Sequence, residues 1–429
     1  MDFEPWWLIF LPLLFALGWI AARVDIRQML SETRNLPNSY FKGLNFLLNE
    51  EPDRAIDAFV EVAKLDPETT ELHFALGSLF RRRGEMERAI RVHQSLLARA
   101  DLPQPDRESA QHELAQDYLK AGMLDRAEQA FELVLDTRFA ISAIRALIRI
   151  YESEHDWPRA IEAVKRLRAL VDEPVPQLVH YQCERAVAAM SVKPPDISAA
   201  DHALDAADHA ANALRGEVHG QASEARIAML RAHLARLSGN PERERNYLVS
   251  VLSIAPEYAS LVAADILDCY HRMGQQVEGL KLMRAHYMRY PSLDTFNVVF
   301  RELRVQEGYH PAWAFAREAL REHPSLLGLD RLLEAELATP EGALTYNTRQ
   351  DGGKGPSMAE GGRSVAAPSV DMRVNADLTL LRSLIHKHTQ RLDRYSCRVC
   401  GFEARNFYWQ CPGCNSWETY EPRRLEELK

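Results

Sequence analysis

Small and large side chains recur along the middle of this chain with a long, regular period. Four sets of residues share the internal offsets 3, 12 and 16, and successive sets begin 34, 38 and 33 residues apart. The sets are Gly43, Phe46, Ala55 and Phe59; Gly77, Phe80, Ala89 and His93; Ala115, Tyr118, Ala127 and Phe131; and Ile148, Tyr151, Ala160 and Val164. This spacing predicts two helices per set, in which small residues let the backbones approach and aromatic side chains fill the adjacent space.

The same pattern continues, with more variation, in the second half of the chain. Two further sets keep the offsets: Leu267, Tyr270, Gly279 and Met283; and Phe300, Leu303, Ala312 and Ala316. Pro256, Pro291 and Pro324 end successive units, because proline cannot continue a helix. The pattern resembles the tetratricopeptide repeat, whose period is about 34 residues. We predict an all-α, right-handed superhelix of seven to eight repeats over residues 36–338, with a concave groove that binds other proteins.

A continuous apolar segment lies at the N-terminus. Residues 6–22, WWLIFLPLLFALGWIAA, carry no charge over 17 positions. A helix of this length reaches about 25 Å, slightly less than the hydrocarbon core of a bilayer. Asp2 and Glu4 precede the segment and Arg23 and Arg27 follow it, so the positive-inside rule places the N-terminus outside and the rest of the chain in the cytoplasm. We predict a single transmembrane anchor, with its juxtamembrane segment, over residues 1–28.

The composition changes after the repeats. Residues 345–373 are rich in glycine and poor in large apolar side chains, which predicts a flexible linker. Leucines at positions 378, 381, 384 and 392, together with Ile385, then recur at helical spacing. We predict that residues 375–429 form a closing helix, which covers the end of the repeats or packs on a small domain, and a compact metal-binding domain.

Four of the six cysteines of the chain form two C-x-x-C pairs in this last segment. The pairs are Cys397 with Cys400 and Cys411 with Cys414, and together they offer four thiolates for a closed tetrahedral site. With no coordination position left open, hydrolytic metal catalysis is disfavoured. Metal binding would also supply the stability that a domain of about thirty residues cannot gain from a core. We favour this site over two independent redox dithiols.

Zinc is the first choice of metal, with iron as the alternative. Four thiolates suit either ion, and rubredoxins hold iron between a similar pair of knuckles but with a longer spacer. We expect Phe402, Phe407, Tyr408, Trp409 and Trp417 to form a small aromatic core, with Trp409 or Trp417 as an alternative exposed contact for a partner.

Charge and composition disfavour other functional classes of protein. The chain of 429 residues has a formal net charge of −9 and a pI near 6.0, which disfavours a nucleic-acid-binding protein. No phosphate-binding G-x-x-x-x-G-K-[ST] loop is present, and arginines and glutamates alternate around the cysteines without forming a basic stripe. Cys183 and Cys269 lie far apart in helical sequence and are expected to be core residues. Nothing in the repeats assembles a catalytic group, so we expect no enzyme.

The order of these modules resembles the lipopolysaccharide assembly protein B family of Gram-negative bacteria. The stretches that carry the resemblance are YFKGLNFLLNEEPDRAIDAF, LGSLFRRRGEMERAIRVHQSLL, DYLKAGMLDRAEQAF and YSCRVCGFEARNFYWQCPGC. The metal ligands of the family fall on Cys397, Cys400, Cys411 and Cys414. The glycine-rich insertion, which spans about Tyr346 to Val370, is longer than the resemblance predicts.

The resemblance implies an adaptor at the cytoplasmic side of the inner membrane. Such proteins act with a membrane AAA+ protease that degrades the UDP-3-O-acyl-N-acetylglucosamine deacetylase, and a membrane regulator relieves this restraint on lipopolysaccharide synthesis. A homodimer is possible within this scheme. Two alternatives are a scaffold that gathers lipopolysaccharide-synthesis proteins without proteolytic control, and a rubredoxin-like electron carrier.

Overall fold

The computed structural model describes residue 19 and residues 41–43, 45–46, 49, 51–65, 70–171, 175–213, 220–337 and 370–428. The chain divides into two compact units, Met1–Ile150 and Tyr151–Lys429, which are described separately. Most of the anchor expected at residues 1–28 and of the linker expected at residues 345–373 lies outside the described ranges. Within those ranges, no helix combines the length and apolar character that crossing a bilayer requires.

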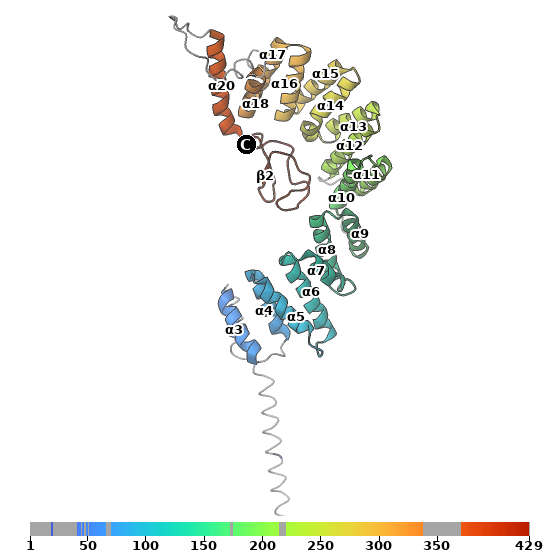
Figure 1. Ribbon diagram of the computed structural model, residues 1–429, viewed down its shortest axis with the longest axis vertical. Coiled ribbons are helices and arrows are strands. Elements are labelled where there is room, and N and C mark those ends of the chain that lie inside the picture. The colour runs from blue at the N-terminus through green and yellow to red at the C-terminus, as the bar shows by residue number, and fades with distance from the viewer. Residues whose placement is uncertain are drawn as a thin grey trace, which may run out of the picture. The chain divides into compact units, whose positions relative to one another are not determined.

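The first unit is an array of helices (Figure 1). Its helices are α3 (Pro52–Leu65), α4 (Thr70–Arg83), α5 (Met86–Leu97), α6 (Gln104–Lys120), α7 (Leu124–Glu132) and the first part of α8 (Ala140–Glu154). Consecutive helices pack against each other and bury the alanines and aromatic residues of the repeating pattern, among them Ala55, Phe59 and Phe80. The all-α repeat architecture predicted from the sequence is therefore confirmed.

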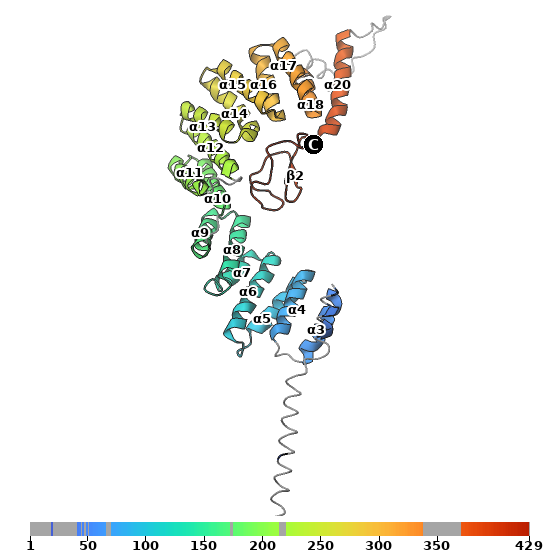
Figure 2. The same ribbon diagram turned by 180° about the vertical axis from the view of Figure 1, so that it is seen from behind.

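The second unit continues this array and ends in the small domain (Figure 2). Its helices are the rest of α8, α9 (Trp157–Leu170), α10 (Gln177–Ser191), α11 (Ile197–Asn212), α12 (Gly220–Leu237), α13 (Pro241–Ile254), the short 3-10 helix η2 (Pro256–Tyr258), α14 (Ala259–Arg272), α15 (Gln276–Arg289), α16 (Leu293–Gln306), α17 (Tyr309–Glu322), α18 (Leu326–Leu337) and α20 (Val370–Thr389). Its largest core cluster runs from Ala225 on α12 to Leu332 on α18. The last repeat helix, α18, ends at Leu337, which is also the end of this described range.

A left-handed residue marks the turn inside most of the described helix pairs, though not inside the pair α10 and α11. Gly84, at φ +83°, ends α4. Its N–H donates to the carbonyl of Arg81 at 3.2 Å, and the N–H of Glu85 donates to the carbonyl of Phe80 at 2.9 Å, which is the Schellman arrangement. The same conformation recurs at Gly122, Gly239, Gly274 and Gly308, and His155 adopts it without being glycine. The recurrence at intervals near 34 residues explains how one hairpin geometry repeats along the chain.

In the hairpin of α4 and α5, the small residue of the first helix closely approaches a ring of the second helix. A Cβ atom added at Gly77 on α4 would lie 2.3 Å from the imidazole of His93 on α5. His93 is fully buried, and its Nδ1 lies 2.5 Å from a carboxylate oxygen of Asp117 on α6. Asp117 also pairs with Arg81 at 2.7 Å. The side chain at the fourth position of the pattern, rather than the alanine at the third, therefore lies over the glycine.

Helix α20 covers the end of the repeats. It packs on α18, where the Nδ1 atom of His386 lies 3.0 Å from the buried carboxylate of Asp330, and Arg382 pairs with Glu334 at 3.4 Å. These contacts place α20 on the last repeat helix. The helix begins at Val370, so its first residues fall within the segment that the composition assigned to the linker.

Replacing Gly77 tests the packing of this hairpin. Gly77→Ala is expected to lower the free energy of unfolding of the first unit by about 1–3 kcal/mol, because the new methyl group overlaps a buried ring that a hydrogen bond holds in place. Chemical denaturation followed by circular dichroism measures this change. Ser78→Ala on the same helix is the control, and equal stability of the two variants would contradict the packing argument.

Candidate metal centre

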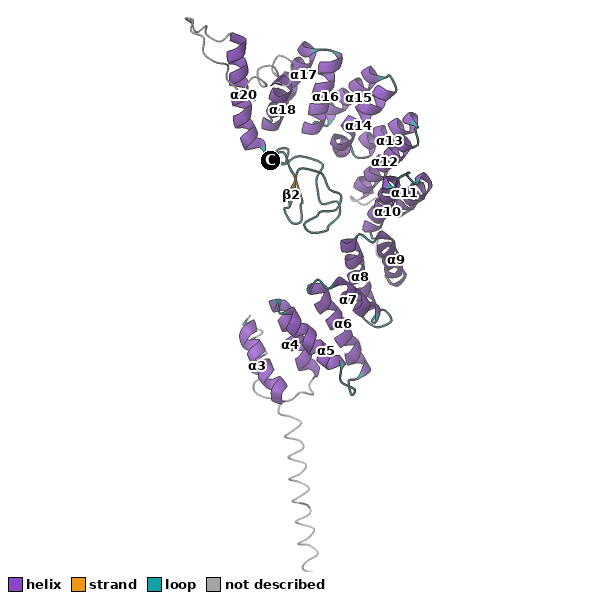
Figure 3. Ribbon diagram, in the orientation of Figure 1, coloured by secondary structure: helices purple, strands orange, loops and turns teal. Residues whose placement is uncertain are grey.

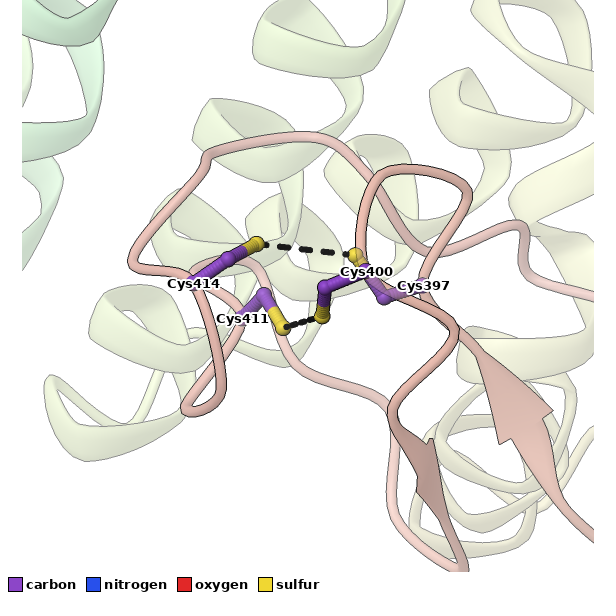
Figure 4. Close-up of side chains that lie close together, drawn as sticks. All are labelled: Cys397, Cys400, Cys411 and Cys414. Atoms are coloured by element: carbon purple, nitrogen blue, oxygen red, sulfur yellow. Dashed lines mark hydrogen bonds between the residues drawn. The ribbon is translucent and has the colours of Figure 1, made fainter. Parts of the chain in front are cut away.

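The four predicted metal ligands converge on one point in the C-terminal domain (Figure 4). Their sulfur atoms all lie within 4.8 Å of one another, with Cys397 and Cys414 at 3.8 Å and Cys400 and Cys411 at 3.6 Å. A tetrahedral ion with bonds of about 2.3 Å to sulfur places its ligands about 3.8 Å apart. Cys397, Cys400, Cys411 and Cys414 therefore fit a single metal ion, as the sequence predicted.

The backbone of this domain is built to hold the two knuckles. Its only regular pairing within the described residues is the short antiparallel pair β1 (Tyr395–Ser396) and β2 (Glu403–Ala404), with Tyr395 opposite Ala404 (Figure 3). Isolated bridges join Cys397 to Tyr420 and Gln410 to Trp417. Gly401, at φ +73°, completes the first knuckle in a conformation that favours glycine.

Hydrogen-bond donors surround the sulfur atoms. The amides of Val399 and Gly413 each lie 3.4 Å from the sulfur two residues earlier, on Cys397 and Cys411. The hydroxyl of Thr419 lies 3.2 Å from the sulfur of Cys397. Donors at these positions stabilise thiolates over thiols, which is the form that binds metal.

Cys397 and Cys400 differ in acidity because different groups surround their sulfur atoms. Burial opposes ionisation of Cys397, but the hydroxyl of Thr419 and the amides of Cys400 and Val399 outweigh it and lower its pKa to about 6. At Cys400 the amide of Phe402 favours the thiolate, yet burial and the neighbouring thiols raise its pKa to about 12. Four thiolates at these distances need a cation between them, so the donor set fits a divalent metal.

The core of the small domain differs from the predicted aromatic cluster. Its buried residues are Tyr395, Cys397, Cys411 and Tyr420, with Phe407 packed against them. Phe402 and Tyr408 are exposed, contrary to the prediction. Trp409 and Trp417 project from the small domain and pack on the repeats. They therefore form neither the internal core of the domain nor an exposed contact for a partner.

Trp417 and the residue after it attach the metal domain to α10. The Trp417 indole lies flat on the imidazole of His180, with ring centroids 4.8 Å apart and an interplanar angle of 2°. Its N–H donates to Glu152 at 3.0 Å. Glu418 has a left-handed backbone at φ +54°, and its carboxylate lies 2.9 Å from Nε2 of His180 and accepts a hydrogen bond from Ser223 at 2.6 Å.

Arg226 on α12 lies beneath both tryptophans. Its guanidinium carbon is 5.3 Å from the ring centroid of Trp409 and 5.4 Å from that of Trp417. It donates to Nδ1 of His180 at 2.9 Å and pairs with Glu184. Burial, reinforced by this arginine, lowers the pKa of His180, so a neutral imidazole with its proton on Nε2 donates to Glu418. Trp409 also stacks on Tyr258, with centroids 5.4 Å apart.

The C-terminal tail attaches the domain to the last repeats. Glu426 accepts hydrogen bonds from the amides of Leu326 at 2.6 Å and Leu327 at 3.0 Å, so it caps the N-terminus of α18. Glu427 accepts from the amide of Leu293 at 2.8 Å at the start of α16. Figures 1 and 2 show the domain on the inner side of helices α10 to α18, so this part of the expected groove is filled by the chain itself.

Residues outside the metal centre have structural roles. Cys183 and Cys269 are buried as expected, and burial raises the pKa of Cys183 to about 12. Sequence reasoning did not find that His180, Arg226 and Ser223 receive the metal domain, because each occurs singly at helical spacing. Their partners in that domain, Glu418 and the two tryptophans, are more than 180 residues away in the chain, beyond the reach of any local pattern.

Removing two ligands tests the metal's structural role. Cys397→Ser with Cys400→Ser is expected to abolish metal binding and unfold the small domain, because the four cysteines make up much of what holds it. Metal content and tryptophan fluorescence measure the loss, while circular dichroism reports the repeats. Cys183→Ala is the control and should retain the metal. A folded, docked domain in the double variant would contradict the assignment.

Replacing Glu418 tests the attachment separately from the metal. Glu418→Gln removes the charge from a buried acceptor and is expected to weaken docking by about 1–3 kcal/mol. Faster amide hydrogen exchange in residues 395–422 and in α10, with unchanged metal content, is the expected result. Glu421→Gln, a change at the edge of the same segment, is the matched control. Equal exchange in the two variants would show that Glu418 contributes nothing to docking.

Comparison with known proteins agrees with this architecture. Residues 395–422 match a family described as the rubredoxin metal binding domain, and residues 72–108 match the tetratricopeptide repeat. Among solved structures, the C-terminal part of a repeat-containing protein from Cytophaga hutchinsonii covers 64% of this chain and 98% of its own. That match has 10% identity and a TM-score of 0.36, which is too low for a structural argument.

Two relatives extend over almost the whole chain. Lipopolysaccharide assembly protein B of Escherichia coli K12 is 29% identical over 419 residues, which cover 97% of each chain. The protein of the same name from Haemophilus influenzae is 24% identical over 431 residues, 98% of each chain. The resemblance expected from the sequence is thereby confirmed, and along nearly its whole length this chain is similar to proteins named lipopolysaccharide assembly protein B.

Proposed function

We propose that this chain is a non-enzymatic adaptor that restrains lipopolysaccharide synthesis at the inner membrane. The observation that carries the proposal is the relation, over 97% of the chain, to proteins named lipopolysaccharide assembly protein B. Tetratricopeptide repeats bind other proteins, which fits an adaptor. Among the described residues, the four cysteines form the one cluster suited to a metal, and a closed site leaves no position for a substrate.

The adaptor would bring a substrate to a protease. We propose that it promotes degradation of the UDP-3-O-acyl-N-acetylglucosamine deacetylase by a membrane AAA+ protease, and that a membrane regulator opposes it. The apolar segment at residues 6–22 would anchor the chain with its bulk on the cytoplasmic side. Anchoring raises the effective concentration of the adaptor beside a membrane protease, so modest affinities for protease and substrate suffice.

The metal would brace the protein rather than carry electrons. We propose that the metal is zinc, held by Cys397, Cys400, Cys411 and Cys414. Trp409, Trp417 and Glu418 fix the domain to the repeats, which fits a bracing role. A rubredoxin-like electron carrier would instead bind iron and show a reversible visible spectrum. A colourless, zinc-loaded protein excludes that alternative.

The half-life of the deacetylase tests the proposed function. After translation is blocked, the deacetylase is expected to persist several-fold longer in cells depleted of this protein than in cells that contain it. Wild-type protein should restore rapid turnover, and the Cys397→Ser, Cys400→Ser variant should not, although it stays in the membrane. An unrelated substrate of the same protease serves as the control. An unchanged half-life would contradict the proteolytic role and favour a scaffold that gathers lipopolysaccharide-synthesis proteins.

A further inference from the structure

Helix α20 presents two different faces along its second half. On one face, Arg382 and His386 pair with Glu334 and Asp330 of α18. Thr389, on the same face, is almost fully buried. Figures 1 and 2 show α20 as the outermost helix, with α18 on one side and no described helix on the other. The face turned away from α18 is therefore open to a further contact.

Three leucines are exposed on that outer face. Leu380 is 60% exposed, Leu381 is 47% exposed and Leu384 is 54% exposed. With 3.6 residues per turn, these positions lie on the side of the helix opposite to Arg382 and His386. A single exposed leucine needs no explanation, but three adjacent ones on one helix face form a contiguous apolar patch of the kind that a protein contact covers.

Opposite charges flank the leucines. Asp377 lies one turn before Leu381, and Lys387 lies one turn after Leu384, so the two charges are about 15 Å apart along the helix. Both side chains are exposed and form no ion pair with another described residue. The outer face thus has a negative end, an apolar centre and a positive end.

The neighbouring charges leave this pattern intact. Arg382 is paired with Glu334 on the opposite face, and Arg391, beyond the end of the helix, is paired with Glu403 at 2.7 Å. A surface for an acidic or a basic partner would carry an excess of one sign. The outer face of α20 carries one charge of each sign, at opposite ends.

A face of this kind is complementary to a copy of itself. When a two-fold axis relates two α20 helices, they run antiparallel, so Asp377 of each copy lies opposite Lys387 of the other and the leucines meet between them. A parallel pair would instead place like charges together, which is unfavourable. Charge therefore selects both the occupant and its orientation.

We propose that this chain forms a homodimer in which the outer faces of two α20 helices pack antiparallel, with Leu380, Leu381 and Leu384 at the centre and Asp377 of each copy paired with Lys387 of the other. One helix per copy buries less than the roughly 1,000 Å² of a stable interface. The dimer is thus weak in dilute solution and is favoured where copies are held close together. The proposal does not rest on the adaptor role.

Complementary charge reversals test the pairing. The full chain in detergent is followed by sedimentation velocity over a series of concentrations. Asp377→Lys alone and Lys387→Asp alone are each expected to weaken the dimer about tenfold, because both flanking pairs become repulsive. An equimolar mixture of the two variants is expected to regain the wild-type affinity, because each altered side chain then meets the opposite charge. Single variants that associate as tightly as the wild type, or a mixture that does not recover, would overturn the proposal.

Matched variants separate this contact from other causes of association. Leu381→Asp with Leu384→Asp, confirmed by circular dichroism and metal content to be folded, is expected to be monomeric. Lys281→Asp, the same charge change at an exposed position of α15, should leave the dimer unchanged. Association that persists in the leucine variant would contradict the proposed face.

A wild-type chain that is monomeric at every concentration would overturn the proposal outright. The leucines would then be covered by the bilayer or by residues 345–365 of the same chain. Faster hydrogen exchange in α20 after deletion of residues 345–365 would identify the second of these. None of these measurements involves the deacetylase or its protease, so failure here is distinct from failure of the proposed function.

Discussion

Four sulfur atoms held within 4.8 Å of one another are the constraint on which the C-terminal part of this protein depends. Although the amide of Phe402 favours its thiolate, burial and the neighbouring thiols raise the pKa of Cys400, so four thiolates at such distances require a cation between them. The β-bridge between Cys397 and Tyr420 and the hydrogen bond between the side chains of Cys397 and Thr419 tie the segment 417–420 to this cluster. That segment carries Trp417 and Glu418, so the metal centre also fixes the groups that meet the repeats.

A buried charge makes this attachment specific. Arg226 is almost fully buried, and an isolated cation there would be costly. Glu184 supplies its counter-charge, while Trp409 and Trp417 supply two ring faces and His180 an acceptor. Two of these four partners, Trp409 and Trp417, belong to the metal domain and meet Arg226 only when the domain is docked as observed. A domain shifted by one residue would leave the guanidinium without its ring contacts, which selects a single arrangement.

The sequence predicted features that local spacing determines. Offsets of 3, 12 and 16 identified the helix pairs, and two C-x-x-C pairs identified all four ligands, because adjacent turns and knuckles depend on nearby residues. The sequence did not predict where Trp409 and Trp417 would pack. In a neutral-looking segment an aromatic residue fits an internal core as well as an interface, and its partners His180 and Tyr258 carry no distinguishing pattern. The filled groove was missed for the same reason.

The composition of the C-terminal segment does not predict how its charges are used in the folded protein. Along residues 390–428, six arginines alternate with six carboxylates, five from glutamate and one from Asp393. In the folded protein, helix N-termini and His180 bind carboxylates, because amide and imidazole N–H groups are donors that attract anions. The arginines of the domain pair mostly with its own carboxylates, Arg391 with Glu403 and Arg398 with Glu421, and Arg424 is the one that reaches the repeats, through Asp294. A balanced count along the chain therefore does not predict which charges meet the repeats.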